Sequence, residues 1–363
     1  MLKQPLKKVL IKRGIITLSL FMAIYLVMLF ANHPDAVEKY YSESSYLFIC
    51  RILHPVFNIF PFSAGDIIYL LVIAYIIYAL VRLIKLFVKK QFAQAGLFTM
   101  AIIIGIQCAV LMFYLLWGLN YFRPSAAKRL NLTDSTFTIA ELQKVTNLLI
   151  DSANACRARV TLEDLEQSND SVYYNARLAV IKLSNSSVQF KTYSPDIKPS
   201  LLTPLLNYIG TYGYYNPFTG EAQINYQMPV FNRPFVACHE MSHQMGYGAE
   251  DEANFAGFLA ARNSGDRLLR YSAYNLALGE FMRTLRYTDS LKFKKLKNRI
   301  SPLVKADFKT ERTYWLSYQT KINAVTSLFY DNFLKANNQP AGLDTYNRMV
   351  LLLMAMYRHN YTL

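Results

Sequence analysis

Charged residues and cysteine are both scarce in this chain of 363 residues, and each scarcity excludes a class of protein. Charged residues make up 17 % of the sequence and hydrophobic residues 53 %, which is not the balance of an ordinary soluble protein. Cysteine occurs four times, at Cys50, Cys108, Cys156 and Cys238, and no two of these positions are close. We therefore expect neither a disulfide framework nor a cysteine-rich zinc site.

Acidic residues are fewer than basic ones, since 24 aspartates and glutamates oppose 39 lysines and arginines and leave a net charge of +15. A basic balance can indicate nucleic-acid binding, but the sequence has no Arg-rich arm, no P-loop and no RNA-binding signature. Much of the positive charge lies beside long apolar runs, where it can face lipid headgroups. The sequence thus indicates a lipid bilayer as a partner and no nucleic acid.

Three apolar runs are long enough to cross a bilayer, at about 14–32, 67–88 and 95–119. The first run is longer than a typical signal-peptide core, so we expect an uncleaved anchor. Trp117, near the end of the third run, is typical of a membrane interface. We expect a membrane domain over residues 1–120 and a second domain over residues 121–363.

Basic residues predict the orientation of these helices. Residues 1–13 contain five lysines and arginines and no acid, and residues 82–90 contain four more basic residues. Such segments stay in the cytoplasm, so three crossings would place residues 121–363 outside it. We expect a multi-pass protein of the inner (cytoplasmic) membrane with an extracytoplasmic domain.

A His-Glu-x-x-His motif is formed by His239, Glu240 and His243, with Pro234 before it and Gly246 after it. On a helix the two histidines share one face and can bind one metal ion. Glu240 projects at a different angle, so it can reach a metal-bound water without binding the metal. This pattern predicts a Zn²⁺ site with two histidine ligands and Glu240 as general base.

A third metal ligand is predicted on a second helix, EDEANFAGFLAAR, which begins at Glu250. Six residues separate His243 from Glu250, and glycines between them permit the chain to reverse. Asn254 shares a helix face with Glu250 and is expected to orient a ligand by hydrogen bonding. Glu252 points elsewhere and is the alternative third ligand.

The remaining pattern predicts a mainly helical protein with a small sheet. Residues 33–65 have the composition of an interfacial segment. Residues 221–228 are predicted to form a strand, which either holds an extended peptide at a sheet edge or belongs to an ordinary hairpin. Further helices are predicted at 266–287, 309–336 and 343–358.

Several blocks resemble a family of membrane-anchored zincin-like proteins catalogued as domain of unknown function 3810. The blocks are PFSAGD at 61–66, LLWGLNYFRP at 115–124, PFTGEAQIN at 217–225, PFVACHEMSHQMGYGAEDEANF at 234–255 and YDNFLKANNQPAGLDTY at 330–346. The core is also similar to the gluzincin group, whose Glu-x-x-Ala-Asp/Asn pattern matches residues 250–254 and favours Glu250 as ligand. Cys238 departs from the aliphatic residue expected there; it either packs as a small apolar side chain, binds metal or has a redox role. The resemblance implies an α+β zincin-like metallopeptidase domain, zinc and peptidase chemistry.

These observations predict a membrane-bound zinc metallopeptidase that hydrolyses peptide bonds of a peptide or protein substrate. An oxyanion donor is also needed, and Tyr330 or another tyrosine of the C-terminal helices could serve. One alternative is a non-catalytic, zinc-stabilised peptide-binding receptor or assembly factor, although such a site would not need Glu240. Another is hydrolysis of an amide outside proteins, such as a cell-wall peptide.

Overall fold

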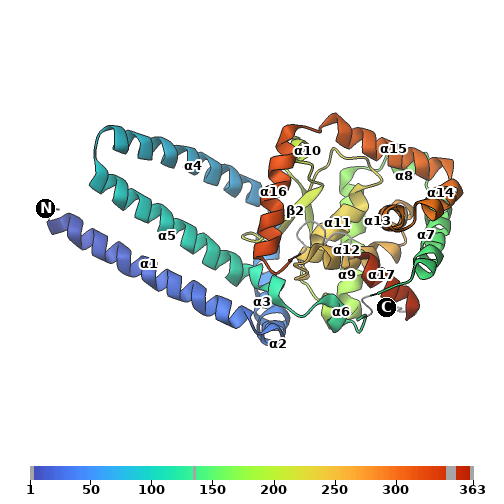
Figure 1. Ribbon diagram of the computed structural model, residues 1–363, viewed down its shortest axis with the longest axis horizontal. Coiled ribbons are helices and arrows are strands. Elements are labelled where there is room, and N and C mark those ends of the chain that lie inside the picture. The colour runs from blue at the N-terminus through green and yellow to red at the C-terminus, as the bar shows by residue number, and fades with distance from the viewer. Residues whose placement is uncertain (1–3, 134–135, 341–348, 360–363) are drawn as a thin grey trace.

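The computed structural model describes residues 4–133, 136–340 and 349–359. Figure 1 shows three long helices that project from one end of a helical body. They are α1 (Gln4–Ala31), α4 (Ala64–Val88) and α5 (Phe92–Leu116). All three are long and apolar enough to cross a membrane, as the sequence predicts.

The third apolar helix ends earlier than its predicted boundary at residue 119. Its last helical residue is Leu116, because Trp117 leaves helical geometry and a 3₁₀ turn, η2 (Gly118–Phe122), follows. The first helix instead begins well before residue 14, since the basic residues ahead of the apolar run are themselves helical. The number of apolar helices was thus predictable, whereas two of their ends were not.

Residues 34–58, within the segment predicted to be interfacial, are helical throughout. The elements here are α2 (Pro34–Ala36), the π-helix η1 (Val37–Ser45) and α3 (Tyr46–Asn58). Tyr46 and Cys50 are buried, as is His54. This segment therefore packs against the body of the protein.

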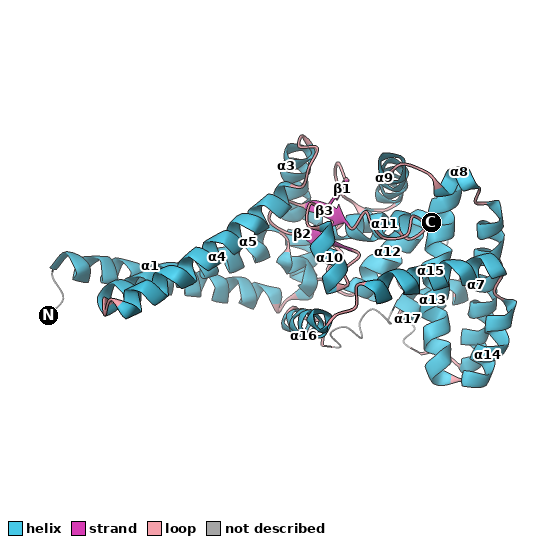
Figure 2. Cartoon of the chain, turned by 90° about the horizontal axis from the view of Figure 1, so that it is seen from above, coloured by secondary structure: helices cyan, strands magenta, loops and turns pink. Residues whose placement is uncertain are grey.

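A small mixed sheet lies beside the domain end of the apolar helices (Figure 2). Its strands are β1 (Ile197–Pro199), β2 (Gly213–Asn216) and β3 (Glu221–Ile224). The order is β1-β3-β2, with β1 parallel and β2 antiparallel to β3. The predicted strand at 221–228 is therefore shorter, and it lies in the middle of the sheet rather than at an edge.

Helices make up most of the remaining chain. They are α6 (Ala126–Arg129), α7 (Ile139–Arg159), α8 (Leu162–Leu165), α9 (Asn169–Ser186), η3 (Val188–Phe190), α10 (Thr203–Ile209), α11 (Arg233–His243), α12 (Glu250–Arg262), α13 (Arg267–Thr288), α14 (Ser290–Arg299), α15 (Pro302–Ser317), α16 (Lys321–Ala336) and α17 (Met349–Arg358). The prediction of a single helix over 309–336 is wrong, because residues 318–320 are not helical and separate α15 from α16. Residues 343–348 of the last predicted helix lie outside the described residues.

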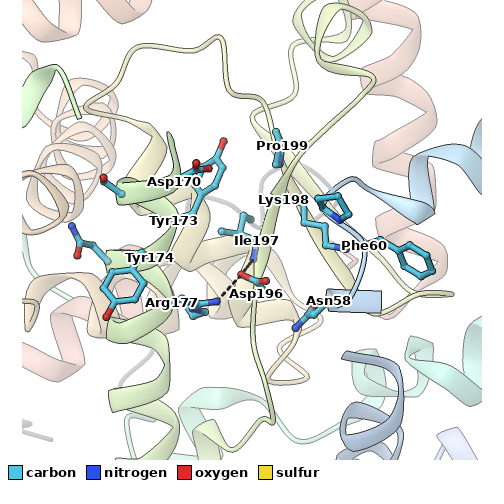
Figure 3. A pocket seen from close by; sticks show the side chains of 13 residues that line it. Asn58, Phe60, Asp170, Tyr173, Tyr174, Arg177, Asp196, Ile197, Lys198 and Pro199 are labelled. Atoms are coloured by element: carbon cyan, nitrogen blue, oxygen red, sulfur yellow. Dashed lines mark hydrogen bonds and ion pairs between the residues drawn. The ribbon is translucent and has the colours of Figure 1, made fainter. Parts of the chain in front are cut away.

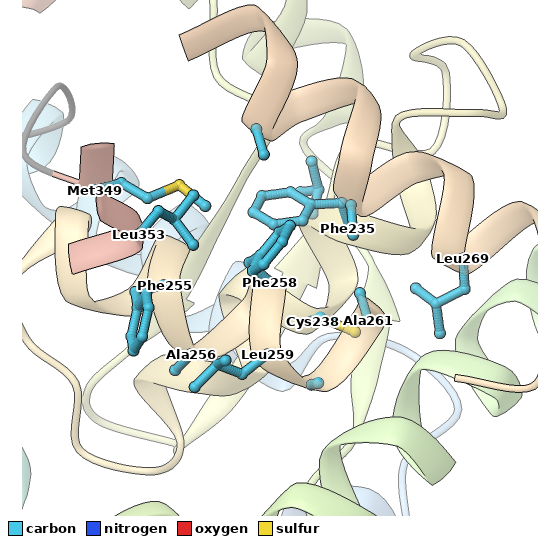
Figure 4. Packing of buried hydrophobic residues seen from close by; sticks show 14 of the residues in the cluster. Phe235, Cys238, Phe255, Ala256, Phe258, Leu259, Ala261, Leu269, Met349 and Leu353 are labelled. Atoms are coloured by element: carbon cyan, nitrogen blue, oxygen red, sulfur yellow. The ribbon is translucent and has the colours of Figure 1, made fainter. Parts of the chain in front are cut away.

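Helix α11 lies at the centre of the body, where it contacts α9, α12, α13 and the sheet. All its residues from Pro234 to His243 are buried. One of its faces enters the main hydrophobic core, where Figure 4 shows Cys238 among Phe235, Ala261 and Leu269. Burial raises the pKa of the Cys238 thiol. Cys238 therefore packs as a small apolar side chain inside the core.

Candidate metal centre

The two histidines of the motif lie one turn apart near the end of α11. Pro234 stands in the first turn of this helix, where its missing N–H leaves no hydrogen bond unmade. The rings of His239 and His243 are 4.9 Å apart between centroids and nearly perpendicular. Gly246 then turns the chain with a φ of +78°, a conformation that favours glycine.

Glu250, the first residue of α12, brings its carboxylate between the two imidazoles. Its Oε2 atom lies 3.2 Å from Nε2 of His239 and 3.8 Å from Nε2 of His243. The three side chains are all buried. Both Nε2 atoms and one carboxylate oxygen, three atoms of the kind that bind zinc, thus converge on one point.

The close approach of α12 to α11 depends on a glycine that sequence reasoning missed. A Cβ atom at Gly257 would lie 3.0 Å from the backbone nitrogen of His239 and 3.1 Å from its Cα. Glycine at this position therefore lets the backbones of α11 and α12, the two helices that carry the three converging groups, pack directly against each other. A lone glycine within the pattern of a predicted helix was the only signal of this contact.

Glu240 lies beside the same point but on another side. The nearest ligand atoms of His239, Glu240 and His243 all lie within 4.8 Å of one another. Its Oε2 atom is buried and has no hydrogen-bond partner among the residues that the structure describes. Burial raises the pKa of Glu240 to about 8, the charge of His239 lowers it, and that of Glu250 adds to the rise. The carboxyl group can therefore accept and release a proton near neutral pH.

Hydrogen bonding orients the ring of His243. Its Nδ1 lies 2.6 Å from the carbonyl oxygen of Tyr247. Burial lowers the pKa of His243 to about 4, so the ring is neutral near pH 7. Because a carbonyl only accepts, Nδ1 carries the proton and Nε2 presents its lone pair toward Glu250.

His239 has a different environment. Burial lowers its pKa, but the hydrogen bond and charge of Glu250 and the charge of Glu240 outweigh burial and raise it. Asn254 is close enough to add to this rise. Among the described residues, however, no hydrogen bond with good geometry reaches His239 Nδ1. The orienting role expected of Asn254 therefore stays a prediction.

The alternative ligand Glu252 lies apart from the histidines. Its Oε2 is 3.2 Å from the guanidinium of Arg129, and its Oε1 accepts a 2.6 Å hydrogen bond from the backbone N–H of Ala126. Arg129 is almost fully buried, with 4 % of its side chain exposed. The structure therefore brings His239, Glu240, His243 and Glu250 together and leaves Glu252 in an ion pair.

Two residues of the C-terminal part contact Glu250. The hydroxyl of Tyr330 on α16 donates a 2.6 Å hydrogen bond to Oε1 of Glu250. The backbone N–H of Glu250 donates to Oε1 of Gln339 over 3.4 Å. Tyr330 therefore lies beside the converging groups, as a candidate oxyanion donor must. The role of Gln339 had no local signal in the sequence.

Two residues next to the apolar helices, Trp117 and Tyr46, form hydrogen bonds with the last turn of α11. Trp117 donates a 2.9 Å hydrogen bond from Nε1 to the carbonyl of His243, and its ring meets that imidazole edge to face. Tyr46 donates to the carbonyls of His243 and Gln244 over 3.2 and 3.0 Å. The composition of the sequence assigned Trp117 to a membrane interface only. Its contact with the motif links residues far apart in the chain.

A separate hollow lies between α9 and β1 (Figure 3). Its volume is about 670 Å³, and its walls include Asp170, Arg177, Asp196 and Lys198. The histidines and glutamates of the motif are not among its lining residues. This hollow therefore does not belong to the candidate metal centre.

Comparison with known proteins matches the chain to a family. No curated protein and no solved structure matches the chain. The family described as "Protein of unknown function (DUF3810)" matches residues 41–354, which include the third apolar helix and the whole candidate metal centre. The chain belongs to this family of proteins of unknown function, DUF3810.

Proposed function

We propose that the protein is a membrane-bound zinc metallopeptidase with a zincin-like domain. The observation that carries this proposal is the convergence of His239, His243 and Glu250, beside which the buried Oε2 of Glu240 has no hydrogen-bond partner among the described residues. Two imidazoles that can bind in their neutral form and one carboxylate are a set of ligands that suits zinc. They leave the fourth coordination position of the ion open. Burying the Glu240 oxygen without a partner costs free energy, which a purely structural site has no reason to incur.

Different residues of the chain would bind the metal ion and transfer the proton. A zinc ion held by His239, His243 and Glu250 would supply a Lewis acid that activates water and polarises a carbonyl. Glu240 takes the proton of the attacking water and returns it to the leaving amine. The Tyr330 hydroxyl, already beside Glu250, can donate a hydrogen bond to the oxygen that becomes negative.

Strand β2 is the best placed element to hold a peptide across this site. It is an edge strand, so one row of its backbone groups has no strand partner in the sheet. A Cβ atom at Gly213 would lie 2.7 Å from Oε1 of Glu240, and the ring of Tyr215 lies 6.2 Å from that of His243. A peptide that paired with β2 would therefore pass directly beside Glu240.

The arrangement of charge supports an extracytoplasmic position for this site. The start of α1 and the turn between α4 and α5 lie at the same end of the apolar helices, away from the body (Figure 1). Basic residues gather at that end, among them Lys7, Lys8, Arg82, Lys85 and Lys89. Basic segments remain in the cytoplasm, so the body would face the other side of the inner (cytoplasmic) membrane.

A reporter fused after residue 363 tests the orientation. We expect activity from a reporter that works only outside the cytoplasm and none from a cytoplasmic reporter. The reverse pattern would place the candidate site in the cytoplasm and overturn the assignment.

Hydrolysis itself is tested with the purified full-length protein and a mixed peptide library. We expect cleavage that stops on removal of zinc by a chelator and returns when zinc is added. Peptides that bind without being cleaved would instead indicate a receptor. Cleavage limited to cell-wall peptides would keep the chemistry and change the substrate class.

A further inference from the structure

Helix α16 carries an apolar face that is largely exposed among the described residues, with only Phe333 packed against other rings. The face consists of Val325, Leu328, Phe329 and Phe333, which are 55 %, 64 %, 73 % and 40 % exposed. Their spacing of three and four residues places them along one side of the helix. Four large apolar side chains in a row on one exposed helix mark an interaction surface rather than scattered surface residues.

The opposite side of α16 faces the protein body. Leu334 is fully buried on that side, and Tyr330 donates its hydrogen bond to Glu250 there. One side of the helix therefore packs against the protein body, and the apolar face lies on the side away from it.

The end of α16 is attached to the end of the third apolar helix. The ring of Phe333 meets that of Phe113 edge to face at 6.1 Å, and Phe113 lies in the last turn of α5. Tyr114 donates a 3.3 Å hydrogen bond to the side chain of Asn337 just after α16. The apolar face of α16 thus continues directly from the surface of a helix that can cross a bilayer.

The direction of α16 fits the surface of a bilayer. Figure 1 and Figure 2 both show α16 lying across the domain end of the apolar helices rather than along them. If those helices cross the membrane, a helix in this direction lies in the plane of the membrane surface. The neighbouring α10 segment is also exposed at three apolar residues, which are Leu201, Leu205 and Tyr208.

We propose that α16 is an interfacial helix whose apolar face, Val325, Leu328, Phe329 and Phe333, lies in the headgroup region of the bilayer that the apolar helices cross. Such helices insert their apolar side by roughly 5–10 Å. Tyr330 on the same helix contacts Glu250, so α16 would contact the bilayer surface on one side and the candidate metal centre on the other. The proposal rests on the membrane attachment proposed above and requires neither zinc nor hydrolysis.

The test measures how close α16 lies to lipid in the full-length protein. Phe329 is replaced by cysteine, and this cysteine is labelled with an environment-sensitive fluorophore. The accessible Cys108 and Cys156 are replaced by alanine in the same protein. Cys50 and Cys238 are buried and can remain. The matched control is Leu291→Cys on α14, another exposed apolar residue, at 77 %, on a helix far from the apolar helices (Figure 1).

Both labelled proteins are placed singly in lipid nanodiscs with and without lipids that carry a nitroxide near the headgroup. We expect the label at position 329 to lose most of its emission to the nitroxide lipids and the label at position 291 to lose little. Leu328→Cys, on the same face, provides a second position if Phe329→Cys does not fold, as judged by size-exclusion chromatography.

Three results would overturn the proposal. One is a label at positions 328 and 329 that the nitroxide lipids do not quench. Another is equal quenching at positions 291 and 329. The third is efficient disulfide cross-linking between two unlabelled Phe329→Cys chains in detergent, together with no quenching of the label in nanodiscs, which would assign the face to a second copy of the protein. Each result stands whether or not the purified protein cleaves peptides.

Discussion

The indole of Trp117 donates a 2.9 Å hydrogen bond to the carbonyl oxygen of His243. Trp117 is the first residue after the third apolar helix, and His243 is the last residue of α11. One contact thus connects the end of a helix that can cross a membrane to a candidate metal ligand. It places the candidate metal centre directly at the level where that helix ends.

Trp117→Phe should weaken zinc binding while the fold is kept. Phenylalanine retains an aromatic ring beside His243 but loses the hydrogen bond, which is worth about 0.5–1.5 kcal/mol. We therefore expect zinc affinity to fall by a factor of about two to ten. Competition with a calibrated chelator measures the change, and Trp315→Phe on α15 is the control. Equal affinity in wild type and Trp117→Phe would show that this contact does not position His243.

Replacing a predicted ligand should remove zinc. We expect His239→Ala and His243→Ala to abolish stoichiometric zinc, because two protein ligands rarely hold the ion tightly. Glu250→Ala should weaken zinc binding far more than Glu252→Ala, since only Glu250 reaches the two Nε2 atoms. Elemental analysis after dialysis gives the metal content. The opposite ranking of the two glutamates would transfer the third-ligand role to Glu252.

Glu252→Gln should instead lower stability and leave zinc in place. Arg129, its partner, has 4 % of its side chain exposed, and loss of the carboxylate leaves a buried charge without its counterion. Breaking such a pair costs about 3–5 kcal/mol. Thermal unfolding in detergent should show a lower midpoint than for Glu163→Gln, a change at an exposed glutamate. An unchanged midpoint would mean that the Arg129 charge finds another partner.

His54 should make stability depend on pH. Burial lowers its pKa to about 4 in the folded protein, against the ordinary value of 6.5. Between these values the unfolded chain binds more protons, so stability falls as the pH falls through this window. The loss is at most about 1.4 kcal/mol per pH unit.

Thermal midpoints near pH 7 and near pH 5 test this prediction. Wild type should lose more stability between the two values than His54→Gln, in which the titrating group is gone. His33→Gln, a change at an exposed histidine, should behave like wild type. Equal losses in wild type and His54→Gln would contradict the assignment.

Local patterns predicted the features that depend on neighbours in the chain. The helical spacing of His239 and His243, the turn at Gly246 and the start of the next helix at Glu250 all follow from residues within one or two turns. The three apolar helices were likewise predictable, because their length and composition are properties of each segment alone.

Contacts between distant segments were not predictable from one sequence. Trp117 and His243 are 126 residues apart, and no local pattern indicates that they meet. The middle position of β3 depends on two partner strands, which the residues of β3 alone do not specify. The break between α15 and α16 was missed because apolar residues continue at helical spacing on both sides of it.

In the proposed mechanism, Glu240 acts as a base on water beside a bound zinc ion. Glutamine in its place keeps the volume of the side chain and removes its basicity. In the purified full-length protein, Glu240→Gln should retain zinc and the wild-type thermal midpoint. Its peptide turnover should fall by about a hundredfold or more, the usual scale for loss of a general base. A Glu240→Gln protein that holds zinc and cleaves peptides at the wild-type rate would show that Glu240 is not the base.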